Sequence, residues 1–290
     1  MKTLWQFFVV AMAICASAAT QAVAQQAGTL FGTTGACNNA VPGGPCTQTS
    51  TLVQIDPRTG ALVRTIGPVG FTVNGLAWDR TTGKLYASTA IGDVRFHGLI
   101  TINTTTGAGT AVDSTVSNFG LDATAGESPV HSIAVDFFGF MFAWYDEFPP
   151  PPGVTDTFVQ INKRTGVAVE FPDTGINTSA NGLAFQTLGA VNVLWNIDSP
   201  RLQDDGTTTQ TAYLINPLNG KPLLARPLSP PGQAALGDFN PRNFLYYGLD
   251  FVPFDPAHTT FLVLVEPFSG VVARVGQTVN NLHVIAFVKP

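Results

Sequence analysis

Charged residues are scarce in this chain of 290 residues. Asp, Glu, Lys and Arg together make up 11% of it, and the formal net charge is −5. Globular proteins usually carry about 25% of charged residues. So few charges exclude a solvated disordered chain and a coiled coil covered with ion pairs. Binding to nucleic acid needs clustered Lys and Arg, and the acidic balance excludes that class as well.

Long hydrophobic runs are also missing, apart from one at the start. Lys2 precedes the apolar stretch Leu4 to Cys15, and small residues follow. This order is typical of a secretory signal peptide, so we expect residues 1–24 to be cleaved. No later run reaches the roughly 18 apolar residues of a membrane helix. We therefore expect a periplasmic or extracellular protein without a transmembrane segment, formed by residues 25–290 as one domain.

Cysteine is rare, with three in the chain. Removal of the leader would take away Cys15 and leave Cys37 and Cys46. Two cysteines this close together in an exported protein predict one disulfide that closes a short loop. Such a loop contributes about 2–3 kcal/mol by the chain-entropy model. A metal-binding pair is the alternative, but no His or further Cys lies nearby in the sequence.

What the sequence does contain is a repeat. Five times, a hydrophobic run ends in Asp, Asn or Glu, and Gly follows after three further residues. The Asx side chain can bond its own backbone, and Gly supplies the positive φ of a tight turn. Each segment therefore predicts a strand followed by a hairpin turn. The turns end at Gly60, Gly107, Gly166, Gly220 and Gly270, at spacings of 47, 59, 54 and 50 residues.

A second pair of strands belongs to each repeat. In the clearest copy, Asn74 to Asp79 and Lys84 to Thr89 flank a short turn. Two more strands follow, on either side of the glycine turn, so each unit has four. Four antiparallel strands in a repeat of roughly 50 residues form one blade of an all-β propeller. Aromatic residues recur in the first two strands, where we expect them to pack between blades: Trp78, Trp144, Phe185, Trp195 and Phe287.

The two ends of the chain complete each other. The C-terminal copy has only a first strand, Leu282 to Val288, and residues 29–66 supply the other three. Closure of the ring removes exposed sheet edges, and five blades of roughly 53 residues fill the mature chain. If the sequence contains one further, degenerate repeat unit, the propeller has six blades. In the last full blade the first strand is either Leu236 to Phe239, which keeps four strands and which we prefer, or Gly248 to Phe251, which leaves the blade a strand short.

The unit resembles the NHL, YVTN and SMP-30-like propeller repeats of exported bacterial proteins. The likeness is clearest in the sequences GLAWD (Gly75 to Asp79) and GKLY (Gly83 to Tyr86). It is architectural, and a fold does not by itself imply an activity. The SMP-30 resemblance implies a metal held by acidic ligands at the mouth of the channel. A quinoprotein is disfavoured because no Trp follows the first three glycine turns.

The connections between strands differ in length. The one between the second and third strands is long in every unit, whereas the other turns within a blade are mostly short. In an antiparallel blade these long connections share one face with the connections between blades. Insertions gathered on one face mark a binding face, although drift in permissive loops is the alternative. We expect the run Pro149 to Pro152 to be a stiff spacer.

The first strands open with polar residues at one repeat position: Asn74, His131, Asn181 and His283. We expect them to ring the mouth of the channel on the long-loop face. Amide and imidazole groups there predict a site for a small polar ligand. A Ca²⁺ or other divalent site is a weaker alternative, as is simple bonding to backbone or water. The candidate metal ligands are His131, His283, Asp122 and Glu127.

Three functions remain open on this reading. The first is an exported, non-catalytic propeller, expected to be a monomer, that binds a ligand or protein partner through its long-loop face. The second is a metal-dependent lactonase, other hydrolase or lyase of the SMP-30 type. No acidic residue stands at the shared repeat position and no common catalytic motif occurs, so we assign no catalytic residue and favour the first. The third is a structural surface or matrix component.

Overall fold

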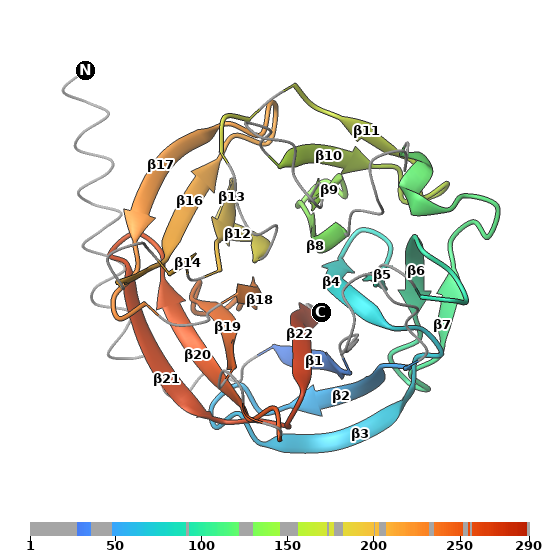
Figure 1. Ribbon diagram of the computed structural model, residues 1–290, viewed down its shortest axis with the longest axis horizontal. Helices are drawn as coiled ribbons and strands as arrows, with labels where there is room; N and C mark the ends of the chain where they lie inside the picture. The colour runs from blue at the N-terminus through green and yellow to red at the C-terminus, as the bar shows by residue number, and fades with distance from the viewer. Residues whose placement is uncertain are drawn as a thin grey trace.

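The computed structural model describes residues 28–35, 48–90, 93–121, 130–145, 156–172, 174–176, 182–199, 201–202, 207–231, 235–251, 255 and 257–288. Within these residues, the strands form five four-stranded antiparallel sheets arranged around a centre (Figure 1). The chain is a five-bladed β-propeller, as the repeat predicts. Among the described residues, no helix has the length and apolar character needed to cross a membrane.

Four blades are continuous in the chain, and each places its first strand innermost. They are β4 (Val73–Asp79), β5 (Lys84–Thr89), β6 (Leu99–Ile102) and β7 (Gly109–Ala111); β8 (Val130–Val135), β9 (Met141–Tyr145), β10 (Thr157–Ile161) and β11 (Ala168–Glu170); β12 (Leu183–Leu188), β13 (Val191–Ile197), β16 (Thr211–Ile215) and β17 (Pro222–Pro227); and β18 (Ala235–Phe239), β19 (Tyr246–Phe251), β20 (Thr260–Glu266) and β21 (Val271–Gln277).

The remaining blade joins the two ends of the described chain. Its order is β22-β1-β2-β3, with β22 (Leu282–Val288) innermost, then β1 (Thr29–Thr34), β2 (Thr51–Ile55) and β3 (Leu62–Pro68). Hydrogen bonds between β22 and β1 therefore close the ring, and the predicted pairing of the ends is confirmed. We call this the first blade and number the others in chain order.

The fifth blade takes the register with four strands. β18 lies beside β19, and Asp238 pairs with Tyr247. The strand is irregular: Leu236 has a φ of 57°, and the register shifts between Ala235 and Asp238. The backbone N–H of Gly237 donates to the hydroxyl of the buried Tyr246 at 2.7 Å. This bond satisfies a polar group that the irregular strand would otherwise leave unpaired.

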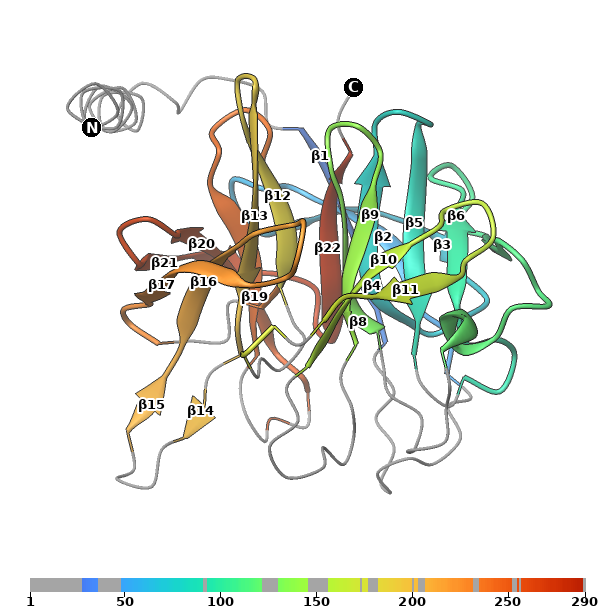
Figure 2. The ribbon, with the colours of Figure 1, turned by 90° about the horizontal axis from the view of Figure 1, so that it is seen from above.

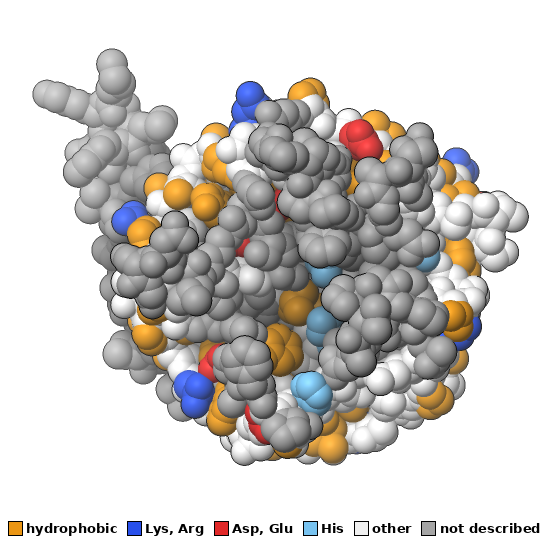
Figure 3. Space-filling view, in the orientation of Figure 1, with side chains coloured by type: hydrophobic (Ala, Val, Ile, Leu, Met, Phe, Trp, Pro, Cys, Tyr) orange, Lys and Arg blue, Asp and Glu red, His pale blue; other side chains and the backbone are white. Residues whose placement is uncertain are grey.

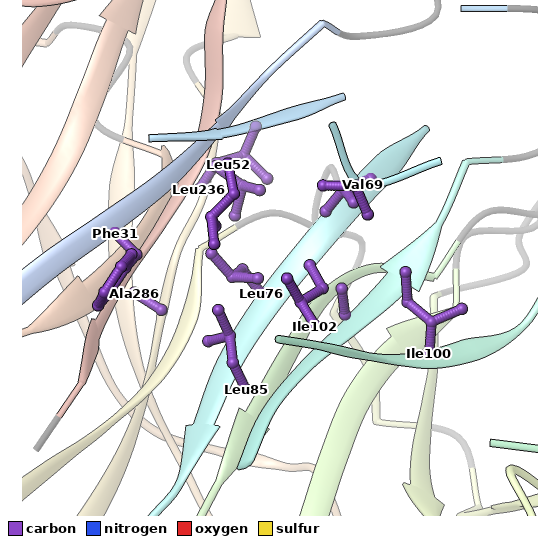
Figure 4. Packing of buried hydrophobic residues seen from close by; sticks show 12 residues of the cluster. Phe31, Leu52, Val69, Leu76, Leu85, Ile100, Ile102, Leu236 and Ala286 are labelled. Carbon is purple, nitrogen blue, oxygen red and sulfur yellow. The ribbon is translucent and has the colours of Figure 1, made fainter. Parts of the chain in front are cut away.

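The core consists of five apolar clusters, each centred between two neighbouring blades. In the cluster of Figure 4, Phe31 and Ala286 of the first blade pack against Leu76 and Leu85 of the second. Inner strands are covered on both faces, which explains their nearly continuous apolar sequences. Burying one large side chain contributes about 1.5–3 kcal/mol. The expected packing of aromatics between blades is confirmed by the fully buried Trp144, Trp195 and Phe287.

Two faces follow from this topology. The turns β4–β5 and β6–β7, with their counterparts in the other blades, lie on what we call the short-turn face. The connections between second and third strands, and those from blade to blade, lie on the opposite, long-loop face. The hairpin β14 (Arg201–Leu202) and β15 (Thr208–Thr209) belongs to a long connection and projects beyond the ring on that side (Figure 2). A 3-10 turn, Asn118–Gly120, lies between β7 and β8.

Candidate functional site

Three of the polar residues at the shared repeat position meet at the channel. Asn74 of β4 lies between His131 of β8 and His283 of β22. Its Nδ2 is 3.4 Å from Nδ1 of His131, and its Oδ1 is 3.2 Å from Nε2 of His283. Histidine side chains gather near the centre of one face of the ring (Figure 3). The structure thus joins three successive blades through one chain of hydrogen bonds, which we call the mouth trio.

Each member of the mouth trio is the extra residue of a β-bulge. In β4, Val73 and Gly75 pair with consecutive residues of β5, and Asn74 has no partner in that ladder. His131 is skipped in the same way in β8, and His283 in β22. A bulge re-aims a side chain and is a feature that proteins place beside functional sites. The repeat therefore directs these side chains to one point at the cost of regular pairing.

The residue before each bulge explains why the bulges lie at this position. Val73, Val130 and Leu282 each open their strand and are completely buried between blades. An apolar anchor of this kind fixes the strand, and the following residue is left to project elsewhere. The pattern of a buried aliphatic followed by Asn or His is a local signal that sequence alone contains.

Hydrogen bonding fixes what the mouth trio can offer a ligand. With the amide oriented as observed, His131 accepts through Nδ1 and carries its proton on Nε2, while His283 donates through Nε2 and keeps a lone pair on Nδ1. The opposite amide orientation exchanges the two roles. In either case, the ring nitrogens not bonded to Asn74 are one donor and one acceptor.

Both imidazoles are neutral at physiological pH. Burial first, and then the charge of the nearby His283, lower the pKa of His131 to about 4. Burial alone lowers the pKa of His283 to about 4. Both histidines are only partly buried by surface area. A ligand can therefore reach the mouth trio from solvent, although most of each ring is covered by protein. Asn74 is buried, with 7% of its surface exposed.

Apolar groups surround the trio and close the channel beneath it. The ring of Phe251 lies 6.5 Å from that of His283, and Phe251 packs against the cluster that contains Leu236 and Val284. Deeper in, the inner strands leave a cavity of about 10 Å³, enough for roughly one water molecule. This cavity is therefore too small for a ligand larger than water.

Asp238 is an acidic group in the wall of this narrow cavity that sequence reasoning missed. In the other four blades, alanine occupies the same place in the register: Ala77, Ala134, Ala184 and Ala286. The carboxylate of Asp238 accepts the backbone N–H of Phe239 at 2.7 Å and that of Phe287 at 2.9 Å. It therefore ties the fifth blade to the first. The irregular backbone of β18 hid this alignment.

The other sequence-predicted residues are placed as follows. Asn181, Asp122, Glu127, Cys37 and Cys46 lie outside the described residues, so the disulfide and the wider metal site remain predictions. Within the described part of the chain, no group of three or more His, Cys, Asp or Glu side chains is arranged to hold a metal ion. The mouth trio supplies two imidazoles and one amide, joined by the two hydrogen bonds to Asn74.

The two faces carry opposite charge in the sequence of their connections. Counted along the chain, the connections of the long-loop face hold twelve acidic and two basic residues, and the short turns hold two acidic and six basic residues. The twelve acids are Asp93, Asp113, Asp122, Glu127, Asp146, Glu147, Asp156, Asp173, Asp198, Asp204, Asp205 and Asp255. The six bases of the short turns are Arg58, Arg80, Lys163, Arg164, Lys221 and Arg242.

No family model and no curated protein matches this sequence. Among solved structures, the chain is similar to the Dos1 propeller (10% identity, TM-score 0.37, 88% of this chain and 70% of that one). It is similar to the periplasmic gluconolactonase PpgL of Pseudomonas aeruginosa (12%, 0.40, 90% and 85%) and to hydrazine synthase of Kuenenia stuttgartiensis (12%, 0.37, 79% and 60%). These likenesses assign neither an activity nor a ligand to the chain, and its fold follows from its own strand pairing.

Proposed function

We propose that this protein is an exported, non-catalytic propeller that binds a small, uncharged polar ligand at the mouth of its channel, on the long-loop face. One observation carries the proposal. Three bulged residues from three blades are aimed at one point and linked through the amide of Asn74. Satisfying backbone groups would not require the same bulge three times at the position where the channel opens.

The chemistry of the mouth trio selects the ligand class. Neutral imidazole and amide groups form hydrogen bonds without carrying charge, which suits a hydroxyl, an amide or a pair of neighbouring hydroxyls. The ring of Phe251 beside His283 suits the carbon face of such a molecule. An anion gains little because the trio carries no positive charge at neutral pH, given the lowered pKa of both histidines.

Binding is favoured over catalysis by what the mouth trio contains. Hydrolysis or lactone opening needs a nucleophile or a bound metal together with a general base. Both imidazoles of the trio already bond the same amide, and neither is paired with a carboxylate in these bonds. The arrangement suits a fixed polar receptor better than a proton relay.

Calorimetry and thermal shift against a panel of probes test the proposal. The panel contains glycerol, neutral monosaccharides and simple amides, with carboxylate and amine analogues for comparison. We expect binding within the neutral set, abolished by Asn74→Leu, which keeps the approximate side-chain volume and removes both polar atoms of the bridge. His283→Gln, which retains one polar group, should weaken binding less.

The matched control is His258→Asn. His258 lies in a long connection outside the mouth trio, and its φ of 49° is one that Asn accepts readily. This variant should bind like the wild type. Two results would contradict the proposed site: an equal loss of binding in Asn74→Leu and His258→Asn, or binding of charged analogues alone.

A further inference from the structure

The turn between β8 and β9 exposes aromatic side chains on the short-turn face. Phe137, Phe138 and Phe140 are 41%, 75% and 54% exposed. The rings of Phe137 and Phe138 lie edge to face, with 5.6 Å between their centroids. Three neighbouring exposed phenylalanines are more than the scattered apolar residues of an ordinary surface.

The fold does not require phenylalanine in this turn. Oδ1 of Asp136 accepts the backbone N–H groups of Phe138 and Phe140 at 2.9 and 2.7 Å, and Gly139 has a φ of 90°. The corresponding turn of the second blade is also built on an Asp and a Gly, but it carries three residues between them, Arg80, Thr81 and Thr82, and no aromatic side chain. The geometry needs only Asp and Gly, so the aromatic side chains have a purpose outside the fold. The same bonds hold the turn rigid.

Basic residues lie in this turn's immediate surroundings and in the neighbouring turns. The guanidinium of Arg80 lies 4.0 Å from the centre of the Phe137 ring. Lys163 bonds the buried carboxylate of Asp79 and lies close to Gly139, which brings the turns of two blades together. Exposed cations follow on each of these turns, namely Lys84 and Arg164. We call Arg80, Lys84, Phe137, Phe138, Phe140 and Arg164 the Phe–Arg patch.

The acidic groups within these turns do not offset the cations at the surface. Asp79 is completely buried and bonded to Lys163, Thr81 and Thr82. Asp136 bonds the backbone of its own turn and keeps its negative charge, but the three exposed cations Arg80, Lys84 and Arg164 outnumber it. The patch therefore presents positive charge and exposed aromatic rings together, in a chain whose net charge is −5.

We propose that the Phe–Arg patch docks the protein on the surface of an anionic lipid bilayer. Cations attract anionic headgroups, and phenylalanine gains by entering the boundary between headgroups and acyl chains. A soluble polyanion would satisfy the cations but would gain nothing from rings as exposed as Phe138. The chain also enters the ring on this face, because Thr29 at the start of β1 pairs with Val288 at the end of β22.

Co-sedimentation of the purified protein with vesicles tests the proposal. Vesicles of phosphatidylglycerol and phosphatidylcholine are compared with phosphatidylcholine alone, at low and high salt. We expect binding to the anionic vesicles that weakens with salt. Phe138→Ser with Phe140→Ser should reduce partitioning by roughly tenfold or more, and Arg80→Ser should reduce it by roughly fivefold.

Two control variants distinguish binding through the Phe–Arg patch from nonspecific binding through any exposed apolar or basic side chain. Leu218→Ser removes the most exposed large apolar side chain, 81% exposed, from a turn of the fourth blade. Arg58→Ser removes a cation from the first blade, outside the patch. Both should retain most of the binding, and because every variant carries the same N-terminal segment, differences among them report on the patch.

Several results would overturn the proposal: no binding to anionic vesicles, equal losses in Leu218→Ser and in the double phenylalanine variant, or dimerisation in the ultracentrifuge that disappears with the two phenylalanines. Competition by dextran sulfate that does not depend on the phenylalanines would point to a soluble polyanion instead. None of these results bears on the mouth trio, which lies on the opposite face.

Discussion

The two faces of the propeller are built from one repeat but are held together by different kinds of hydrogen bond. On the short-turn face, an acidic or amide side chain accepts backbone N–H groups within most turns, as Asp56 and Asn103 do for Arg58 and Thr105. On the long-loop face, side chains bridge neighbouring blades. Oγ of Ser88 donates to the carbonyl of Val130, and Oγ of Ser132 accepts the N–H of Leu183. The first kind of bond is local and the second is not.

This difference explains where function can be placed. A turn that satisfies its own backbone leaves its remaining side chains free, and the β8–β9 turn uses that freedom for exposed phenylalanines. The long-loop face needs long-range bonds at the inner strands, where each bulge turns one polar side chain toward its neighbours. The site of the mouth trio is therefore coupled to ring assembly, whereas the backbone of the β8–β9 turn is held by its own Asp136.

The largest effect on stability is expected at Asp79, where a side chain of the short-turn face bonds a neighbouring blade as well as its own turn. The carboxylate of Asp79 is buried and bonds Lys163, 84 residues away, as well as Thr81 and Thr82. Asp79→Ala should lower the free energy of unfolding in urea by about 3–5 kcal/mol, because it leaves a partly buried Lys163 unpaired. Asp113→Ala removes an exposed Asx turn and should change stability by only about 0.5 kcal/mol. Equal effects would show that Asp79 is not an interblade brace.

Acid should weaken the long-loop face before the short-turn face. Burial lowers the pKa of His131 and His283 from 6.5 to about 4. Between these values the unfolded chain binds more protons, so stability is complete above pH 6.5 and is lost as the pH falls towards 4. Urea unfolding at pH 7 and 4.5 should differ by up to about 2–3 kcal/mol per imidazole.

A double variant, His131→Gln with His283→Gln, isolates the contribution of the two histidines to the pH dependence of stability. It should lose distinctly less stability than the wild type over the same pH interval. Hydrogen bonds to Lys163, Thr81 and Thr82 outweigh burial and hold the pKa of Asp79 below its usual 3.8. Its contribution is therefore lost only below that pH, outside the interval measured. An unchanged pH dependence in the double variant would contradict the assignment to these histidines.

A smaller effect should distinguish serines on the two faces. Ser132→Ala removes the acceptor of the Leu183 N–H, a buried bond of 2.9 Å between the third and fourth blades. Leaving that group unpaired should reduce the free energy of unfolding by about 1–3 kcal/mol. Ser269→Ala lies in an exposed turn of the short-turn face and should stay within about 0.5 kcal/mol of wild type. Similar losses would mean that the two faces do not differ in this respect.

The smallest effect is expected at the exposed aromatic turn. Phe138→Ser removes a side chain that is 75% exposed, so the melting temperature should hardly change and the free energy of unfolding should stay within about 0.5 kcal/mol. Solubility should rise, since an exposed apolar group is lost. A loss above 1 kcal/mol would show that this ring is packed and would weaken the case for a docking surface.

Much of the fold could be predicted from the sequence because a repeat contains its own alignment. The Asx–Gly turns marked the strand ends. The C-terminal copy of the repeat has one strand and the N-terminal copy has three, so the pairing of β22 with β1 in one blade could be predicted. β18 was harder, because Leu236 adopts a positive φ and shifts the register. The alignment of Asp238 with the alanines of other blades depends on that shift and appears only in three dimensions.

The candidate site was predictable in its members but not in its chemistry. A shared repeat position placed Asn74, His131 and His283 together, yet the bulges and the bridging role of the amide required coordinates. The pairing of Asp79 with Lys163 could not be predicted, because no local pattern links residues in different blades. The exposure of the phenylalanines in the β8–β9 turn could not be predicted, because sequence alone does not show which side chains of a turn face solvent.

The central claim is that a dry, neutral and hydrogen-bonded mouth trio forms the binding site. Nitrogen-detected NMR titration of the imidazoles, assigned with His131→Gln and His283→Gln, tests it most directly. The account predicts that both rings remain neutral down to about pH 5 and titrate near the pKa of about 4 set by burial, with one fixed tautomer each. Titration of both rings near 6.5 with mixed tautomers would show an open, hydrated mouth and would contradict it.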